Sequence, residues 1–115
     1  VLKAGSNPCP PEIIGVGVGG TAAEVTHRAT LASLRPINVR NPEKEFAELE
    51  EELKEAINLS QIGVMGMGGD TTVLAVNIEY SAAHNPWLPV TVNINCWPGR
   101  RASCRLYADG RLEQI

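Results

Sequence analysis

The most reactive side chains in this 115-residue sequence belong to three cysteines, Cys9, Cys96 and Cys104. A thiolate is a nucleophile and a ligand for soft metals, whereas a buried and inert thiol is the ordinary alternative. No pair has the C-x-x-C spacing of a structural zinc site, and the odd, sparse set argues against a disulfide framework. Cys9 stands out because Pro10 and Pro11 hold the following backbone extended, which fixes where its thiol points.

A glycine-rich turn follows Cys9 after a short apolar run. Gly15, Gly17 and Gly20 spell G-x-G-x-x-G, the dinucleotide-binding fingerprint. Two features weaken this interpretation. Gly20 precedes the residue that caps the next helix, and the segment 34–40 is basic where an acidic residue would be needed. The simpler interpretation is a tight strand-to-helix turn whose backbone N–H groups could meet an anion.

A second glycine-rich segment covers residues 63–72. So many glycines lose conformational entropy on folding, which suggests a backbone that must pass close to another group. A flexible loop is the alternative interpretation. Met65 and Met67 within this segment are expected to pack against neighbours and not to bind a metal.

The composition excludes several classes of function. A formal net charge of −3, few aromatic residues and no basic stripe argue against nucleic-acid binding. No apolar run is long enough to span a membrane, and no export signal is visible, so we expect a cytoplasmic protein. The sequence begins with Val1-Leu2-Lys3-Ala4, which is typical of the tail of a helix already under way. We therefore expect the chain to be part of something longer.

The pattern of residues predicts two helices. The first covers residues 22–34, begins with a capping box between Thr21 and Glu24, and ends before Pro36. The second begins at Asn41, with Pro42 in its first turn. Its predicted apolar face consists of Phe46, Leu49, Leu53, Ala56 and Ile57. Its charged residues, Glu45, Glu48, Glu50, Glu51, Lys54 and Glu55, are expected to face solvent.

The alternation of apolar and polar residues predicts the strands. Residues 12–18, 72–80 and 90–96 read as strands, and residues 105–115 as a final hairpin around Asp109-Gly110. Cys96 would then lie on the apolar face at the end of its strand. We expect an α+β fold with two helices on a mostly antiparallel sheet, forming an incomplete part of a larger domain. The glycine loops, Cys9 and Cys96 are expected to gather at one edge.

Several motifs together resemble class I iron–sulfur fumarate hydratases, in particular the C-terminal portion of their alpha subunits. L-tartrate dehydratase alpha subunits share the pattern. The resemblance covers nearly all of residues 1–115. The residues that carry it are Cys9-Pro10-Pro11 with the following I-x-G-V-G-V-G-G-T, the G-x-G-G-D-T-T loop, His84, and Asn95-Cys96-Trp97-x-x-Arg100-Arg101.

The resemblance implies a [4Fe-4S] cluster held by three cysteines, with one iron open to substrate. Cys9 and Cys96 match two of these ligands. The third belongs to a Cys-Gln-Asp-Thr-Gly type motif that is absent from residues 1–115, and Cys104 matches no ligand. His84 matches a histidine that contacts the dicarboxylate substrate. Arg100, with Arg101, could pair with a carboxylate or could form an ordinary salt bridge.

The function implied is reversible hydration of fumarate to L-malate, as one part of an iron–sulfur hydro-lyase. The partners implied are the N-terminal half of the alpha subunit and a beta subunit, which supply the acid and base, and an oligomer is expected. L-tartrate dehydratase is the alternative within this class. A non-catalytic module that binds a cluster or a partner is an alternative from another class, and a nucleotide-binding domain is the weakest.

Overall fold

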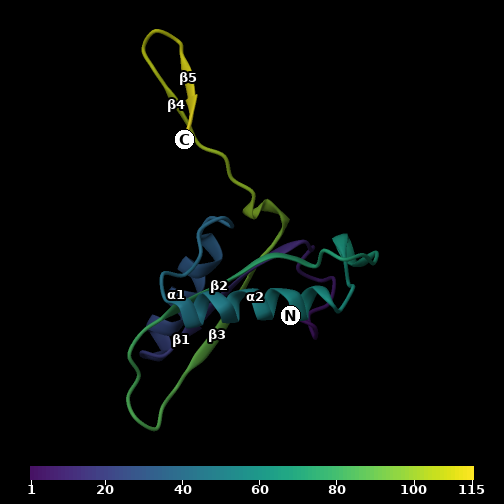
Figure 1. The fold of residues 1–115 in the computed structure, drawn as a ribbon, viewed down its shortest axis with the longest axis vertical. Helices are drawn as coiled ribbons and strands as arrows, with labels where there is room; N and C mark the ends of the chain where they lie inside the picture. Colours follow the sequence, from purple (N-terminus) through teal and green to yellow (C-terminus); the bar gives the residue numbers. More distant parts are fainter.

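The computed structural model describes residues 1–115, except for the side chain of Pro98. Its elements follow one another along the chain (Figure 1). They are β1 (Glu12–Val18), α1 (Ala22–Leu34), α2 (Lys44–Asn58), η1 (Val64–Gly66), β2 (Val73–Tyr80), β3 (Val90–Asn95), η2 (Trp97–Gly99), β4 (Cys104–Leu106) and β5 (Leu112–Gln114).

The central sheet has the strand order β2-β1-β3. β1 pairs antiparallel with β3 and parallel with β2. The predicted α+β fold with two packed helices is therefore confirmed, and the sheet is mixed. The parallel pair follows from the long connection between β1 and β2, which contains both helices and returns the chain to the same end of the sheet.

The two faces of β1 explain where the helices pack. Gly15 and Gly17 point towards α1, where an added Cβ would lie 2.0 Å from the Ala29 carbonyl oxygen and 2.1 Å from that of Val25. These glycines therefore permit close packing of helix on strand. Ile14 and Val16 point to the other face and form the core. The core also contains Val73, Val76 and Ile78 of β2, with Phe46, Leu53 and Ile57 of α2 packed against it.

The helix ends confirm one prediction and correct another. α1 begins with the expected capping box: Thr21 N–H donates to Glu24 Oε2 at 2.8 Å, and Glu24 N–H donates to Thr21 Oγ1 at 3.3 Å. α2 begins later than expected, with Glu43 at its N-cap. Asn41 instead accepts a hydrogen bond from Glu43 N–H at 2.9 Å, because its side chain closes the turn before the helix.

Two parts of α2 differ from the predicted pattern. Leu49 remains 40% exposed, and Ala56 is also exposed. Glu50, expected to face solvent, is fully buried. Its burial is made possible by hydrogen-bond donors from three separate segments, which are Arg35, Asn41 N–H and Ile78 N–H.

The C-terminal residues form the expected hairpin from β4 and β5, which stands apart from the rest of the chain in Figure 1. None of the helices described in the chain is both long enough and apolar enough to cross a membrane.

Candidate functional site

Cys9 lies in a tight turn that precedes β1. Its backbone has a φ of 59°, in the left-handed region that a residue with a side chain adopts only at some cost. Its N–H donates to the Ser6 carbonyl oxygen at 3.0 Å, which helps to hold this conformation. The thiol is partly buried. The turn therefore presents the Cys9 thiol in a fixed direction at the start of β1.

The second glycine-rich segment supports this turn from outside. Met65 N–H donates to the Pro10 carbonyl oxygen at 2.8 Å. A Cβ added to Gly66 would lie 2.3 Å from the Ser6 Cβ, and one added to Gly63 would lie 2.0 Å from the Gly68 carbonyl oxygen. The close approach predicted from the glycines is thus an approach to the Cys9 turn. Met65 and Met67, predicted to pack, are 50% and 82% exposed because the backbone makes these contacts.

Cys96 directly follows β3. Ile13 pairs with Asn95 in the antiparallel register, so Cys96 lies at the end of the sheet where β1 begins. Asn95 anchors this end of β3 to α1, since its Nδ2 donates to the Ser33 carbonyl oxygen at 3.4 Å. The same amide approaches Gly99 so closely that an added Cβ would lie 2.7 Å away. Cys9 and Cys96 thus reach one end of the sheet from opposite ends of the chain.

Arg100 and Arg101 follow Cys96 at this end. The Arg100 guanidinium lies 3.7 Å from the centre of the Trp97 ring, and its Nη1 donates to the Trp97 carbonyl oxygen at 2.8 Å. Arg101 donates to the Leu34 carbonyl oxygen. Among the side chains that the structure describes, neither arginine pairs with a carboxylate. The ordinary salt bridge considered for them is therefore not formed within the described chain.

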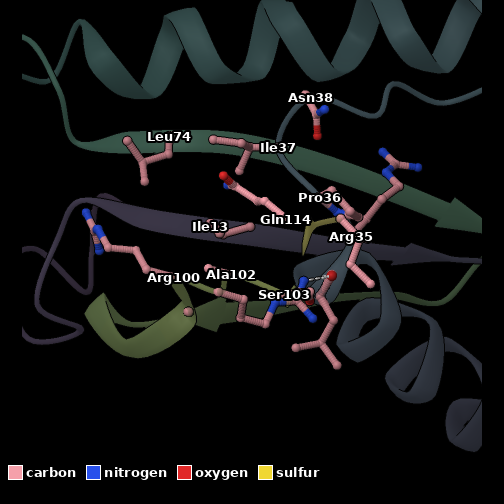
Figure 2. Close-up of a pocket in the computed structure, with 14 residues that line it drawn as sticks. Ile13, Arg35, Pro36, Ile37, Asn38, Leu74, Arg100, Ala102, Ser103 and Gln114 are labelled. Carbon is pink, nitrogen blue, oxygen red and sulfur yellow. Dashed lines mark hydrogen bonds between the residues drawn. The ribbon is translucent and has the colours of Figure 1, made fainter. Parts of the chain in front are cut away.

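Both arginines line a cavity of about 580 Å³. Its walls come from the sheet, from the segment after α1 and from the C-terminal residues. Figure 2 shows Ile13 and Leu74 on neighbouring strands opposite Ile37, with the Arg100 guanidinium turned away from these apolar side chains. The cavity therefore has an apolar wall from Ile13, Ile37 and Leu74, and a polar and cationic rim that includes Arg100 and Arg101.

The other end of the sheet holds His84 and the first glycine turn. His84 is exposed in the loop between β2 and β3. Gly20 N–H donates to the Ala82 carbonyl oxygen at 3.2 Å, and Gly19 N–H donates to that of Pro89 at 2.9 Å. The expectation that both glycine loops gather with the cysteines is therefore wrong for Gly19 and Gly20. The N–H groups of Gly19 and Gly20 are therefore already bonded and are not free to meet an anion.

The distance between the two ends of the sheet bears on the predicted role of His84. The seven residues of β1 lie between the two ends, and a strand of this length extends roughly 20 Å. The dicarboxylate that the sequence resemblance implies is much shorter than this distance. The structure therefore brings Cys9, Cys96 and Arg100 to one end of the sheet and does not bring His84 to them.

Glu12 is a residue at the cysteine end that sequence reasoning missed. It is fully buried, and neither carboxyl oxygen has a hydrogen-bond partner among the described residues. Burial raises the pKa of Glu12 above its ordinary value of 4.5. The sequence signal that could have identified Glu12 is an acidic residue directly before the apolar run of β1.

Substitution of this residue gives a testable pH dependence. Since the pKa is raised in the folded state, the unfolded chain ionises first, and the carboxyl destabilises the fold as pH rises through and above 4.5. We expect Glu12→Gln to increase the free energy of unfolding at neutral pH by on the order of 1 kcal/mol. The gain should vanish well below pH 4.5, and urea titrations at both pH values would measure it. The exposed control Glu52→Gln should show no such dependence, and equal behaviour of the two variants would contradict the prediction.

The donors at this end fit part of an iron–sulfur site. Two thiols, Cys9 and Cys96, are partly buried at the same end of the sheet, and cysteine thiolates are the usual ligands of such clusters. No group of three or more metal-binding side chains occurs among the described residues. The chain therefore offers two thiols at this end, and a cluster with three cysteines would need the third from outside residues 1–115.

Comparison with known proteins identifies the family of this chain. The family model of fumarate hydratase (Fumerase) matches residues 1–105. The chain is 47% identical over 112 residues to a Methanocaldococcus jannaschii protein named "Putative L(+)-tartrate dehydratase subunit alpha", covering 97% of this chain and 39% of that protein. It is 38% identical over 109 residues to an Escherichia coli L(+)-tartrate dehydratase subunit alpha, covering 95% of this chain and 36% of that protein.

A Shigella boydii L(+)-tartrate dehydratase subunit alpha is similar to the same extent, at 37% identity over 109 residues. The chain thus spans less than two fifths of the length of these relatives. The family match nevertheless covers most of the chain, including Cys9, Cys96 and Arg100. The chain therefore belongs to the fumarate hydratase (Fumerase) family of hydro-lyases.

Proposed function

We propose that this chain supplies two of the three cysteine ligands of a [4Fe-4S] cluster in a hydro-lyase that interconverts L-malate with fumarate and water. Cys9 and Cys96 are the proposed ligands. The observation that carries the proposal is their convergence at one end of the sheet, set by the pairing of Ile13 with Asn95. The third cysteine, the rest of the alpha-type domain and a beta subunit would come from outside residues 1–115.

The residues around the two thiols have defined tasks in this proposal. When bound, the cluster would supply an iron that acts as a Lewis acid towards the substrate hydroxyl and carboxylate. The glycine segment 63–68 holds the Cys9 turn through Met65 N–H. Arg100 lies four residues after Cys96, and its guanidinium is oriented by Trp97, so it could bind the second carboxylate in a bidentate manner.

The resemblance also gives His84 a role in binding the dicarboxylate. Within one chain, His84 lies at the opposite end of β1 from both cysteines. We therefore propose that His84 contacts substrate only if the assembly places it beside the cysteines of another chain. In that case the active site would be shared between copies.

A second candidate reaction is dehydration of L-tartrate. It is favoured by the curated relatives that carry the name L(+)-tartrate dehydratase subunit alpha. Tartrate differs from malate by one hydroxyl group. A site built to hydrogen-bond a substrate hydroxyl rejects the analogue that lacks it by roughly 10⁴–10⁵-fold. The two reactions can therefore be separated by a ratio of kcat/KM values.

The test is an anaerobic assay of the native assembly after reconstitution with iron and sulfide. We expect turnover of L-malate and fumarate that is lost on exposure to air, because an open cluster is accessible to oxygen. A preference for tartrate by several orders of magnitude would select the second candidate. A reconstituted assembly that turns over neither substrate would refute both.

A further inference from the structure

Two threonines end the second glycine-rich segment, and the structure treats them differently. Thr71 is exposed, whereas Thr72, directly before β2, is fully buried. Burying a hydroxyl is unfavourable unless it is hydrogen-bonded, so the partners of a buried threonine show what it does. The bonds of Thr72 therefore define its task in the fold.

The three polar groups of Thr72 join three different segments. Its N–H donates to the Asn58 Oδ1 at 2.8 Å, at the last residue of α2. Its hydroxyl oxygen accepts from Gly63 N–H at 3.1 Å, at the beginning of the glycine-rich segment. Its carbonyl oxygen accepts from Glu12 N–H at 3.0 Å, at the start of β1. One residue therefore connects a helix, a loop and the strand that follows Cys9.

Asn58 holds this junction in place. Besides accepting from Thr72, its Oδ1 accepts from Val73 N–H at 2.9 Å, and its Nδ2 donates to the Val73 carbonyl oxygen at 3.3 Å. Asn58 ends a helix whose Leu53 and Ile57 pack against the core. The Thr72 hydroxyl is thus fixed relative to the core of the protein.

The glycine-rich segment carries this fixed position to the Cys9 turn. Two backbone groups that closely follow Cys9 are bound to the segment: the Pro10 carbonyl oxygen accepts from Met65 N–H, and Glu12 N–H donates to the carbonyl oxygen of the segment's last residue. In Figure 1 the teal loop after α2 lies beside the purple N-terminal segment. The conformation of Cys9, with its φ of 59°, is unfavourable and persists only while its surroundings enforce it.

Cys96 is held by different contacts. It follows β3, whose last residue, Asn95, pairs with Ile13 and donates to the Ser33 carbonyl oxygen. These bonds involve the sheet and α1, and they do not pass through the glycine-rich segment. A change confined to that segment should therefore alter the placement of Cys9 and leave Cys96 where it is.

We propose that Thr72, held by Asn58, is a positioning residue for the Cys9 ligand. Its hydroxyl fixes the beginning of the glycine-rich segment, and that segment holds the Cys9 turn. The inference rests on the proposed function, because a fixed direction of the Cys9 thiol matters to activity only if that thiol binds the cluster.

The variant Thr72→Val tests this role in the full-length protein. It removes the hydroxyl with little change of shape and leaves the backbone bonds of Thr72 possible. In the protein freed of cluster, we expect iodoacetamide to modify Cys9 about fivefold faster or more, because the turn opens more often, while the rate at Cys96 stays unchanged. Mass spectrometry of the peptides measures both rates. Thr72→Ser keeps the hydroxyl and should restore the slow rate, and the exposed Thr71→Val is the matched control.

The outcomes separate a positioning role from general loosening of the fold. Equal acceleration at Cys9 and Cys96, or no acceleration at Cys9, would overturn the inference. After reconstitution, Thr72→Val should also lose iron to a chelator roughly tenfold faster or more. If Cys9 reacted faster but iron loss were unchanged, the contact would stand and Cys9 would not be a ligand, so the proposed function would fail instead.

A second pair of variants acts on the same contact from the side of the turn, without creating a buried unpaired N–H group. Gly66 and Gly68 have φ values of 77° and 89°, so alanine is strained at both positions. Only at Gly66 would the added Cβ meet the turn, 2.3 Å from the Ser6 Cβ, whereas at Gly68 it meets no atom within 4 Å. Gly66→Ala should therefore speed modification of Cys9 and Gly68→Ala should not. If the two behaved alike, the segment would not hold the turn, and Thr72 would not position Cys9 through it.

Discussion

Serine in place of Cys9 or Cys96 is expected to prevent cluster assembly and to abolish hydro-lyase turnover in the native assembly. Each thiol supplies one of three proposed ligands, and both are fixed at the same end of the sheet by separate backbone elements. Changing a hydrogen-bond partner of a metal ligand already costs roughly 10–100-fold in affinity or activity. Removal of a ligand should exceed that range. Iron content, visible absorption and kcat would be measured after anaerobic reconstitution.

The third cysteine provides the matched control. Cys104 lies in the C-terminal hairpin, and its thiol is exposed. Cys104→Ser should therefore retain the iron content, spectrum and turnover of the unchanged assembly. If Cys9→Ser and Cys96→Ser retained full iron and full turnover, these thiols would not be ligands. If Cys104→Ser lost iron, Cys104 would itself be a ligand and its use as a control would be wrong.

Local patterns in the sequence were sufficient to predict the elements that carry the cysteines. The capping box at Thr21 and the strand at residues 90–95 depend on neighbouring residues, and both are found in the structure. The predicted apolar face of that strand is not buried, since Val90 and Val92 are 57% and 50% exposed. The placement of Cys96 next to the start of β1 required only antiparallel pairing of two predicted strands. Such features are visible in sequence because the interactions that set them are short in range.

Features set by contacts between distant segments could not be predicted in this way. Gly15 and Gly17 match the dinucleotide-binding motif in the sequence, but α1 occupies the space beside them in the structure. The N–H groups of Gly19 and Gly20 are taken by the loop before β3, which a motif cannot reveal. His84 lies at the other end of β1 because its loop joins β2 to β3 there. Sequence spacing alone does not show which end of a sheet a loop occupies.

Glu50 is the clearest example of such a distant contact. The helical pattern placed it among the solvent-facing glutamates of α2, yet its side chain is fully buried. It accepts hydrogen bonds from Ile78 N–H at 2.7 Å, from Asn41 N–H at 3.3 Å and from the Arg35 guanidinium. Arg35 also pairs with Glu79 at 3.0 Å. One carboxylate therefore joins the end of α1, the segment before α2, and β2.

Loss of this carboxylate should destabilise the fold severely. Glu50→Ala leaves Arg35 without its buried partner and leaves the Ile78 and Asn41 N–H groups without an acceptor. Breaking a buried pair in this way costs about 3–5 kcal/mol, a large share of the roughly 5–15 kcal/mol that stabilises a typical domain. Urea unfolding followed by circular dichroism would measure the change. The neighbouring Glu51 is the matched control, because its pair with Arg40 is exposed to solvent, and such pairs contribute about 0–1 kcal/mol.

A double substitution separates the charge from the shape of the site. In Arg35→Met/Glu50→Met both charges are removed together, so no uncompensated ion is left inside the protein. Replacing a buried pair by apolar residues of similar volume is often close to neutral. We therefore expect the double variant to be more stable than Glu50→Ala, although the two N–H groups still lack an acceptor. Equal destabilisation by Glu50→Ala and Glu51→Ala would show that the buried network contributes little. A double variant no more stable than Glu50→Ala would instead assign the loss to the backbone N–H groups, making the carboxylate mainly an edge cap for β2.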